Sequence, residues 1–290
     1  MAYIGNRPFD IMLASLLGAE RPATEEELTC FLRGLLTADW EANDGAIRLK
    51  RDLTIEQVVG SILFDQTRVF LRTLIEDKGA PLTKTGNLNR AVILRLVERM
   101  AWPRRAVEDC RRVFPSKKFD EWDVPYLQYI RAISECAGLA VKRRERLLAT
   151  KRTIALCDDA LAGPLFHRLF TACFRRFNLG FLGGMPETPG VQYTIAVIFW
   201  RLSLKANDWI AAGKLPEEVF LPTVSAEIQH LNRWEGAEAS ALLVRVLEPL
   251  TWFGLLETDT PKDDHPRPSE DRKFRKTPLF DQFLSFVFKP

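Results

Sequence analysis

Between residues 54 and 150 the spacing of apolar side chains changes several times, and each change predicts a different element. A helix is expected from Thr54 to Gly79, because Thr54 and Gln57 form a capping box, apolar residues follow at helical spacing, and Lys78-Gly79 is typical of a helix end. Residues 81–86 are bounded by Pro and Gly, which favours a strand or an extended turn. The segment therefore opens as a helix and then a strand.

Two further helices and a hairpin follow in the same segment. Asn87 is expected to cap the second helix, and the third runs from Pro125, a residue that costs no hydrogen bond in a first turn, to Gly138. Short apolar runs on both sides of a charged tip predict a β-hairpin over 139–149, after which Thr150 is suited to cap another helix. Helix, strand, helix, helix and hairpin is the order of a winged helix.

The chain before this segment predicts a small helical extension. We expect a helix over 9–17, a second helix opened by a capping box at 24–27, and a short strand at 47–49. These elements are expected to pack against the first winged helix.

Beyond residue 160 the pattern predicts a second helical unit. Its expected elements are an apolar helix over 163–177, a central helix over 191–204, a short helix carrying Trp209, helices over 222–234 and 235–253 with a kink at Pro249, strands flanking a polar tip at 259–270, and a last helix over 278–288. This order repeats that of the first unit, with Gly254-Leu255 in the place of Gly138-Leu139.

The predicted fold is therefore mainly α with small β-hairpins, and contains two winged-helix units packed with additional helices. The expected domains are an N-terminal helical extension (1–53), a first winged-helix domain (54–160), and a helical second domain with a winged-helix-like C-terminal part (161–290).

The composition is typical of a soluble globular protein, and the cysteine and histidine spacing argues against a local metal site. Apolar residues make up 47% and charged residues 27%, with a net charge of +3, and no secretory leader or spanning apolar run is evident, so we expect a cytoplasmic protein without a membrane partner. The five cysteines are widely spaced and are expected to be reduced. The three histidines show no local ligand spacing, which leaves only a zinc site assembled by tertiary folding open, and we expect no cofactor.

Positive charge is concentrated between Arg99 and Arg152, although the whole chain is nearly neutral. In a winged helix the third helix meets base edges while basic residues of the wing and turn reach phosphates. The candidate base-reading residues are Gln128 and Arg131. The candidate phosphate-binding residues are Lys142, Arg143, Arg144, Arg146, Lys151 and Arg152 around the hairpin, and Arg104, Arg105, Arg111 and Arg112 in the connection before the third helix.

Other interpretations of this charge remain open. It is also consistent with a solvated face, the connection before the third helix is longer than a helix-turn-helix turn, and Asp120, Glu121 and Asp123 would repel phosphates beside that helix. The alternative function is a protein-interaction module or homodimer that uses apolar helices such as 191–204 or 278–288.

Catalysis is not expected from these residues. The chain has no nucleophile elbow, H-E-x-x-H, Ser-x-x-Lys or kinase signature, and its Gly183-Gly184 turn matches no phosphate-binding pattern. His167 lies among Phe and Leu, where a histidine is more often a packed core residue than a base. We therefore predict a protein that is not an enzyme.

Several spaced segments carry a family resemblance. They are Thr85-Gly86-Asn87-Leu88, Phe174-Arg175-Arg176-Phe177-Asn178, Met185-Pro186 with Pro189-Gly190-Val191-Gln192, and Lys276-Thr277-Pro278-Leu279-Phe280. The chain resembles an uncharacterised helical region found in bacterial proteins of plasmids and other mobile elements. The resemblance implies a bacterial source and a regulatory, mobile-element or defence-related setting, and it assigns no activity to any residue. In architecture alone, the chain is also similar to tandem winged-helix subunits of chromosome-organising complexes.

Overall fold

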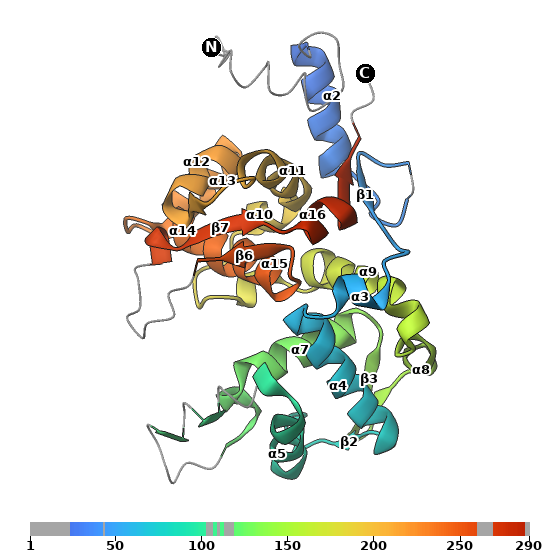
Figure 1. The fold of residues 1–290 in the computed structure, drawn as a ribbon. Coiled ribbons are helices and arrows are strands. Elements are labelled where there is room, and N and C mark those ends of the chain that lie inside the picture. The colour runs from blue at the N-terminus through green and yellow to red at the C-terminus, as the bar shows by residue number, and fades with distance from the viewer. Residues whose placement is uncertain are drawn as a thin grey trace.

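The computed structural model describes residues 24–42, 44–102, 107–108, 111–112, 119–259 and 269–287. This part of the chain is mostly helical and carries three small antiparallel sheets (Figure 1). The helix expected over 9–17, and residues 260–268 of the polar tip expected at 259–270, lie outside the described residues.

The first unit contains the predicted helices, strand and hairpin in the predicted order. Its elements are α3 (Ile55–Val58), α4 (Ile62–Glu76), β2 (Ala80–Pro81), α5 (Arg90–Arg99), α7 (Pro125–Cys136), β3 (Ala140–Arg143), β4 (Arg146–Ala149) and α8 (Lys151–Leu156). The hairpin strand β4 also pairs with β2, so the strand order in this sheet is β2-β4-β3.

Two boundaries in this unit differ from the prediction. The helix expected from Thr54 to Gly79 is interrupted at Gly60, whose φ is +95° and whose amide donates to the Asp65 carboxylate at 2.9 Å. The second helix is capped by Asn89 and not by Asn87, because the Asn87 backbone is bound to Thr83 and only Asn89 reaches the first turn, accepting from the Val92 amide at 3.0 Å. Both errors concern turn geometry, which a hydrophobic pattern does not encode.

The second unit repeats the order of helices, sheet strands and a closing helix. It comprises α9 (Ala162–Thr171) with a π-helical turn (Ala172–Arg176), α10 (Pro189–Tyr193), α11 (Ile195–Lys205), β5 (Ile210–Ala211), α12 (Leu215–Val219), α13 (Pro222–Leu231), α14 (Ala237–Leu242) with a π-helical turn (Leu243–Leu247), α15 (Glu248–Trp252), β6 (Leu256–Thr258), β7 (Lys273–Lys276), α16 (Pro278–Phe283) and β8 (Leu284–Phe286). Its sheet has the order β5-β7-β6, so in both sheets the third strand lies between the first and the second.

Two predictions for the second unit need correction, and a third gains detail. Trp209 directly precedes strand β5 and does not lie on a helix. Where a kink is expected at Pro249, the helix has a π-helical turn just before this residue, which has no amide proton to give to the Arg245 carbonyl. The last helix ends at Phe283, and residues 284–286 pair as β8 with β1 (Ile47–Leu49).

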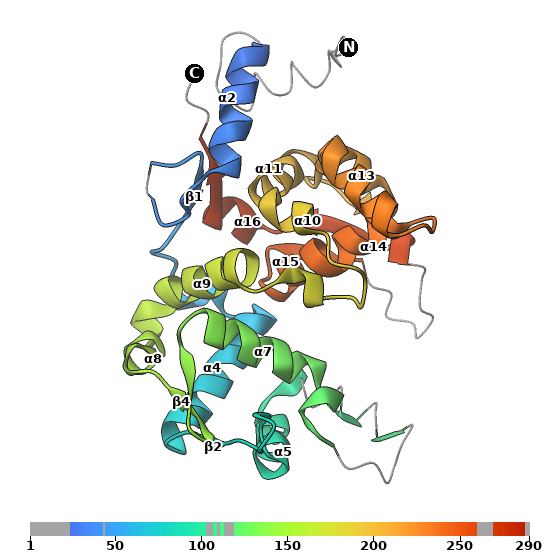
Figure 2. The same ribbon diagram turned by 180° about the vertical axis from the view of Figure 1, so that it is seen from behind.

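The N-terminal segment packs on the second unit, contrary to the expectation that it covers the first. Helix α2 (Glu25–Leu36) has the predicted capping box, and its Phe31 meets Trp200 of α11 edge to face at 5.2 Å between ring centroids. Trp40 stacks on Phe170 at 5.8 Å. Together with the β1–β8 pairing, these contacts join the two ends of the described chain, and Figures 1 and 2 show α2 and β1 beside α16.

Both hairpins are closed by the same arrangement of glycine, leucine and threonine. Gly138 and Gly254 end their helices at φ +68° and +71°, where a side chain would be strained. After each hairpin a threonine returns to this point: the Thr150 hydroxyl donates to the Gly138 carbonyl at 3.0 Å, and the Thr277 hydroxyl donates to that of Gly254 at 2.6 Å. Thr150 thus occupies the predicted cap position of α8, but its hydroxyl is bound to the helix end before the hairpin.

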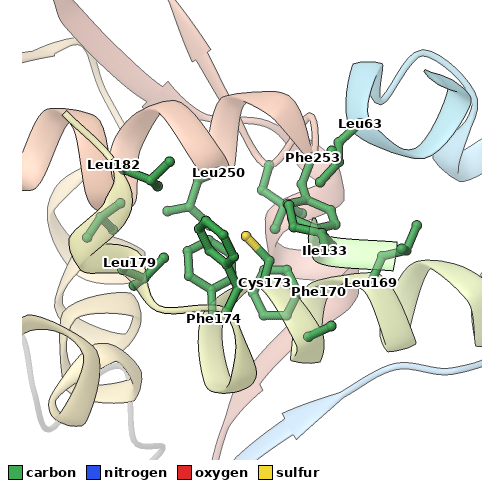
Figure 3. Packing of buried hydrophobic residues seen from close by; sticks show 14 of the residues in the cluster. Leu63, Ile133, Leu169, Phe170, Cys173, Phe174, Leu179, Leu182, Leu250 and Phe253 are labelled. Carbon is green, nitrogen blue, oxygen red and sulfur yellow. The ribbon is translucent and has the colours of Figure 1, made fainter. Parts of the chain in front are cut away.

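Helix α9 lies between the two units, and its phenylalanines contact both. Phe170 lies 5.3 Å from Phe253 and 4.9 Å from Phe283, and Phe166 lies 6.1 Å from Phe64 of the first unit, between ring centroids. Figure 3 shows this cluster with Leu63 and Ile133 on the side of the first unit. One continuous core therefore spans both units.

The buried His167 predicts a pH dependence of stability. Its side chain is 4% exposed, and burial lowers its pKa below the ordinary value. Because the unfolded chain takes up the proton first, the free energy of unfolding should fall as pH drops below about 6.5, by at most about 1.4 kcal/mol per pH unit. Urea unfolding between pH 7.5 and 5 would measure this.

Two substitutions test whether His167, and not the other described histidine, His230, causes the pH dependence of stability. His167→Gln should flatten the dependence in this pH range, whereas His230→Gln, at an exposed position, should leave it unchanged. An equal slope in the wild-type protein and in His167→Gln would show that other groups cause the effect.

The hydroxyl of Thr277 should stabilise the second hairpin. Thr277→Val keeps the shape of the side chain and removes the hydrogen bond to Gly254, so unfolding should become about 1–2 kcal/mol easier. Thr223→Val, at an exposed position of α13, is the control and should change stability by less than about 0.5 kcal/mol. Equal urea midpoints for both variants would contradict this role.

Candidate nucleic-acid interface

The β3–β4 hairpin is held rigidly at its base. Leu139 and Leu147 are fully buried beneath it, and the Thr153 hydroxyl donates to the Leu139 carbonyl at 2.5 Å. The turn residue Arg144 has a φ of +52°. Packing fixes the base of the hairpin while its charged tip remains at the surface.

Three predicted phosphate-binding residues form this tip. Lys142, Arg143 and Arg144 are exposed, and their side chains make no hydrogen bond or ion pair within the described part of the chain. The turn at 83–86 lies against the hairpin, because a Cβ added to Gly86 would come within 2.6 Å of the Lys142 ammonium nitrogen. That turn contributes the exposed Lys84. The fold thus adds a cation that sequence reasoning missed.

A second group of cations surrounds the start of α8. Lys151 and Arg152 are exposed on its first turn. Arg168 and Arg176 donate to the carbonyls of Ala137 and Cys136, at 2.9 and 3.4 Å, at the carboxyl end of α7. Burial lowers the pKa of Arg168, and the nearby charges of Arg152 and Arg176 lower it further. Neither Arg168 nor Arg176 was among the predicted site residues, because only the fold brings α9 to the end of α7.

Arg146 has a structural contact that the prediction did not include. Its guanidinium donates to the carbonyls of Lys78 and Gly79 at 3.2 and 2.7 Å, where α4 has ended. It therefore ties the hairpin to α4, and it is less available to a phosphate than the three tip residues.

The two candidate base-reading residues are engaged within the protein. The Gln128 amide donates to the Glu121 carbonyl at 2.7 Å. Arg131 donates to the Glu121 carboxylate at 2.7 and 3.0 Å, to Glu135 at 2.9 Å and to the Gly86 carbonyl at 2.9 Å, and its side chain is only 13% exposed. These bonds use the donors that would have met base edges.

The surroundings of α7 lead to the same conclusion. Along this helix only Pro125 and Glu135 are exposed, and Tyr129 stacks on Trp252 of α15 at 5.5 Å between ring centroids. Ser134 is fully buried and donates to the Ile130 carbonyl. Because the π-helical turn after α9 packs on α7 and Trp252 stacks on Tyr129, this helix presents little free surface to a major groove.

The remaining predicted cations belong to the connection before α7. Arg104 and Arg105 lie outside the described residues. Arg111 and Arg112 are exposed in a short helical stretch, and Arg111 lies over the Phe119 ring at 5.3 Å from its centroid.

The acidic residues beside α7 have local roles. Asp120 accepts from the Trp122 amide at 2.8 Å, and Asp123 accepts from the Asp120 amide at 3.1 Å. Glu121 is 3% exposed and accepts from the Leu88 amide at 2.6 Å as well as from Arg131. Its pairing with Arg131 reduces the repulsion of phosphates expected from sequence.

Three of the resemblance segments converge on one loop of the second unit. Gln192 donates to the Phe177 carbonyl at 2.8 Å and accepts from the Leu179 amide at 3.2 Å. Arg245, only 1% exposed, donates to the Pro186 carbonyl at 2.7 Å and to the Thr188 hydroxyl. Burial lowers the pKa of Arg245. A cavity of about 400 Å³ lies beside this loop and is lined by Arg175, Arg176 and Tyr193 among others.

Comparison with family models gives a match within the first part of the chain. Residues 59–162 match the model of the Y4jL N-terminal domain, an uncharacterised family without an assigned activity. The match begins at the break between α3 and α4 and ends at the first residue of α9, so it contains the whole hairpin and its cations. No curated protein and no solved structure matches the chain.

The described residues also bear on metal sites, disulfides and membrane-spanning helices. There, no group of three or more His, Cys, Asp and Glu side chains is arranged to hold a metal ion. The described cysteines Cys30, Cys136, Cys157 and Cys173 form no disulfide. No helix in this part of the chain has both the length and the apolar character needed to cross a bilayer.

The ion pair between Glu121 and Arg131 should be important for stability. Arg131→Met would leave Glu121 buried without its cation, and unfolding should become about 3–5 kcal/mol easier. Urea unfolding of the purified variant measures the change.

Two further variants make this test specific. Glu121→Gln combined with Arg131→Met removes both charges and should recover part of the loss, whereas Arg143→Met at the exposed tip should change stability by less than about 0.5 kcal/mol. A double variant no more stable than Arg131→Met would show that the buried charge is not the cause.

Proposed function

We propose that the protein associates with nucleic acid through the β3–β4 hairpin, mainly by contacts to phosphates. The observation that carries the proposal is the hairpin tip, where the side chains of Lys142, Arg143 and Arg144 are exposed and have no partner among the described residues. Long cations held at the end of a rigid hairpin can approach a phosphate backbone without rearrangement of the core. Lys84, Lys151 and Arg152 would extend the contact.

The proposal includes a winged-helix assignment for both units. The order α4, β2, α5, α7, β3, β4 and the strand order β2-β4-β3 support it in the first unit, with β3–β4 as the wing. The sheet β5-β7-β6 and the repeated threonine contact support it in the second. A bacterial mobile-element source, expected from the resemblance, belongs to the same proposal.

The geometry favours binding with little sequence preference. Since α7 is covered and both Gln128 and Arg131 are bonded internally, base edges would have no reader on this helix. The affinity should therefore depend on salt far more than on DNA sequence.

Protein association is the second candidate function. The helices expected to supply it are internal, because residues Ile195–Trp200 of α11 and both Phe280 and Phe283 of α16 are buried. A partner would have to use another surface, and the exposed aromatic residues Trp122 and Phe181, at 71% and 72% exposure, favour a search there.

Charge reversal at the hairpin tip tests the nucleic-acid proposal. Arg143→Glu with Arg144→Glu should weaken binding to a labelled random-sequence duplex at least tenfold near 100 mM salt. It should also reduce the slope of log affinity against log salt by about two, since about 0.9 is lost per phosphate contact. Fluorescence anisotropy across a salt series measures both quantities.

The matched control carries the same change in net charge elsewhere. Lys214→Glu with Arg233→Glu alters two exposed residues of the second unit and should keep most of the affinity and the original slope. Equal losses in the two double variants, or no binding by the wild-type protein at low salt, would overturn the proposal.

A further inference from the structure

A cleft between the two units has a chemistry opposite to that of the hairpin. It occupies about 430 Å³ between the first turns of α7 and the helix formed by α14 and α15. Tyr126, Tyr129 and Trp252 supply aromatic walls, and Asp123 and Glu248 supply carboxylates. None of the residues lining the cleft is basic. Its size is in the range of ligand sites.

The aromatic walls form one connected group. Trp102 lies 4.1 Å from Tyr126 and 5.2 Å from Trp252, and Tyr129 stacks on Trp252 at an interplanar angle of 18°. Because these rings come from both units, the group exists only in the assembled fold. Ring faces attract cations through their quadrupole, and planar guanidinium groups stack on them well.

Two carboxylates lie in the lining, and each already has a contact within the protein. Glu248 pairs with Arg272 through Oε1 at 2.9 Å, and the described part of the chain supplies no other hydrogen bond to this carboxylate. Asp123 accepts from the Asp120 amide at 3.1 Å. Burial raises the pKa of Tyr129, and the nearby Glu248 charge contributes to this rise. The lining itself supplies carboxylates and no cation, so it suits a cationic side chain better than a phosphate.

Two exposed aromatic residues flank the cleft along the chain. Trp122 directly precedes the lining residue Asp123, and Phe181 directly precedes the lining residue Leu182. Their side chains are 71% and 72% exposed. Large aromatic side chains are enriched in the cores of protein interfaces. Each of these exposed aromatic residues is therefore one position along the chain from a residue of the cleft lining.

We propose that this cleft docks a partner polypeptide by receiving one of its arginine side chains. The guanidinium would stack against the tyrosine and tryptophan rings and face Glu248 and Asp123. Apolar residues next to that arginine would cover Trp122 and Phe181. The surface is thus a protein-docking site that is separate in place and in charge from the hairpin.

Two peptides that differ only in charge test the proposal. One is a labelled pentapeptide with a central arginine between leucines, and the other has citrulline in place of arginine. The wild-type protein should bind the arginine peptide saturably in fluorescence anisotropy at 150 mM salt, and at least fivefold more tightly than the citrulline peptide. This comparison requires no variant and is independent of whether a substitution folds.

A matched pair of variants places the binding in the cleft. Glu248→Gln should weaken binding of the arginine peptide at least fivefold. Glu257→Gln is the control, because Glu257 also pairs with an arginine, Arg275 at 2.7 Å, but does not line the cleft. The Glu257→Gln variant should bind the arginine peptide with the same affinity as the wild-type protein.

Each outcome of this experiment is decisive. Equal affinity for the two peptides would show an apolar surface without cation recognition and would overturn the proposal, as would the absence of saturable binding. Equal effects of Glu248→Gln and Glu257→Gln would place the arginine elsewhere and would also overturn it. DNA binding by the hairpin is measured separately, so failure of either proposal leaves the other intact.

Discussion

The arrangement of this molecule depends on the packing of the phenylalanines of α9. Phe166 and Phe170 contact rings from both units and from the C-terminal helix α16, while Trp40 of the N-terminal segment stacks on Phe170. Each fully buried aromatic side chain contributes roughly 1.5–3 kcal/mol, and the ring pairs add somewhat more. Because the same few rings serve all these elements, the two units share one core. This packing also places α7 of the first unit beside α15 of the second. The cleft and the partly covered face of α7 follow from that position.

The hairpins of the two units share one backbone arrangement but differ in the charges they carry. Each unit has a glycine that ends a helix, a buried leucine, a hairpin and a threonine that returns to the glycine carbonyl. In the first unit the side chains of Lys142, Arg143 and Arg144 have no partner among the described residues. On the β7 strand of the second unit, Arg275 is paired with Glu257 and Lys276 with Asp281. The same backbone arrangement thus carries cations that differ in their pairing in the part of the chain that the structure describes.

Charge in this protein has to be judged by its partners. Arg131 and Glu121 are ten positions apart and neutralise each other under the turn at Gly86, whereas Arg146 stabilises the end of α4. A basic or acidic residue counted along the chain gives no sign of such pairing. The six predicted cations near the hairpin looked equivalent in sequence, but the fold separates Arg146, which is bonded to backbone carbonyls, from the exposed tip residues.

The sequence by itself determined the elements that depend on local rules. Capping boxes at Thr24 and Thr54, the glycine end at Gly138 and the β3–β4 hairpin could be predicted, because each depends on residues a few positions apart. The exposed tip Lys142 to Arg144 could be predicted for the same reason. Only the tertiary structure decided the pairing of β1 with β8, the packing of α2 on α11, the covering of α7 and the aromatic cleft. These features arise from contacts between segments distant in sequence, and hydrophobic periodicity shows that a face is buried without showing which partner buries it.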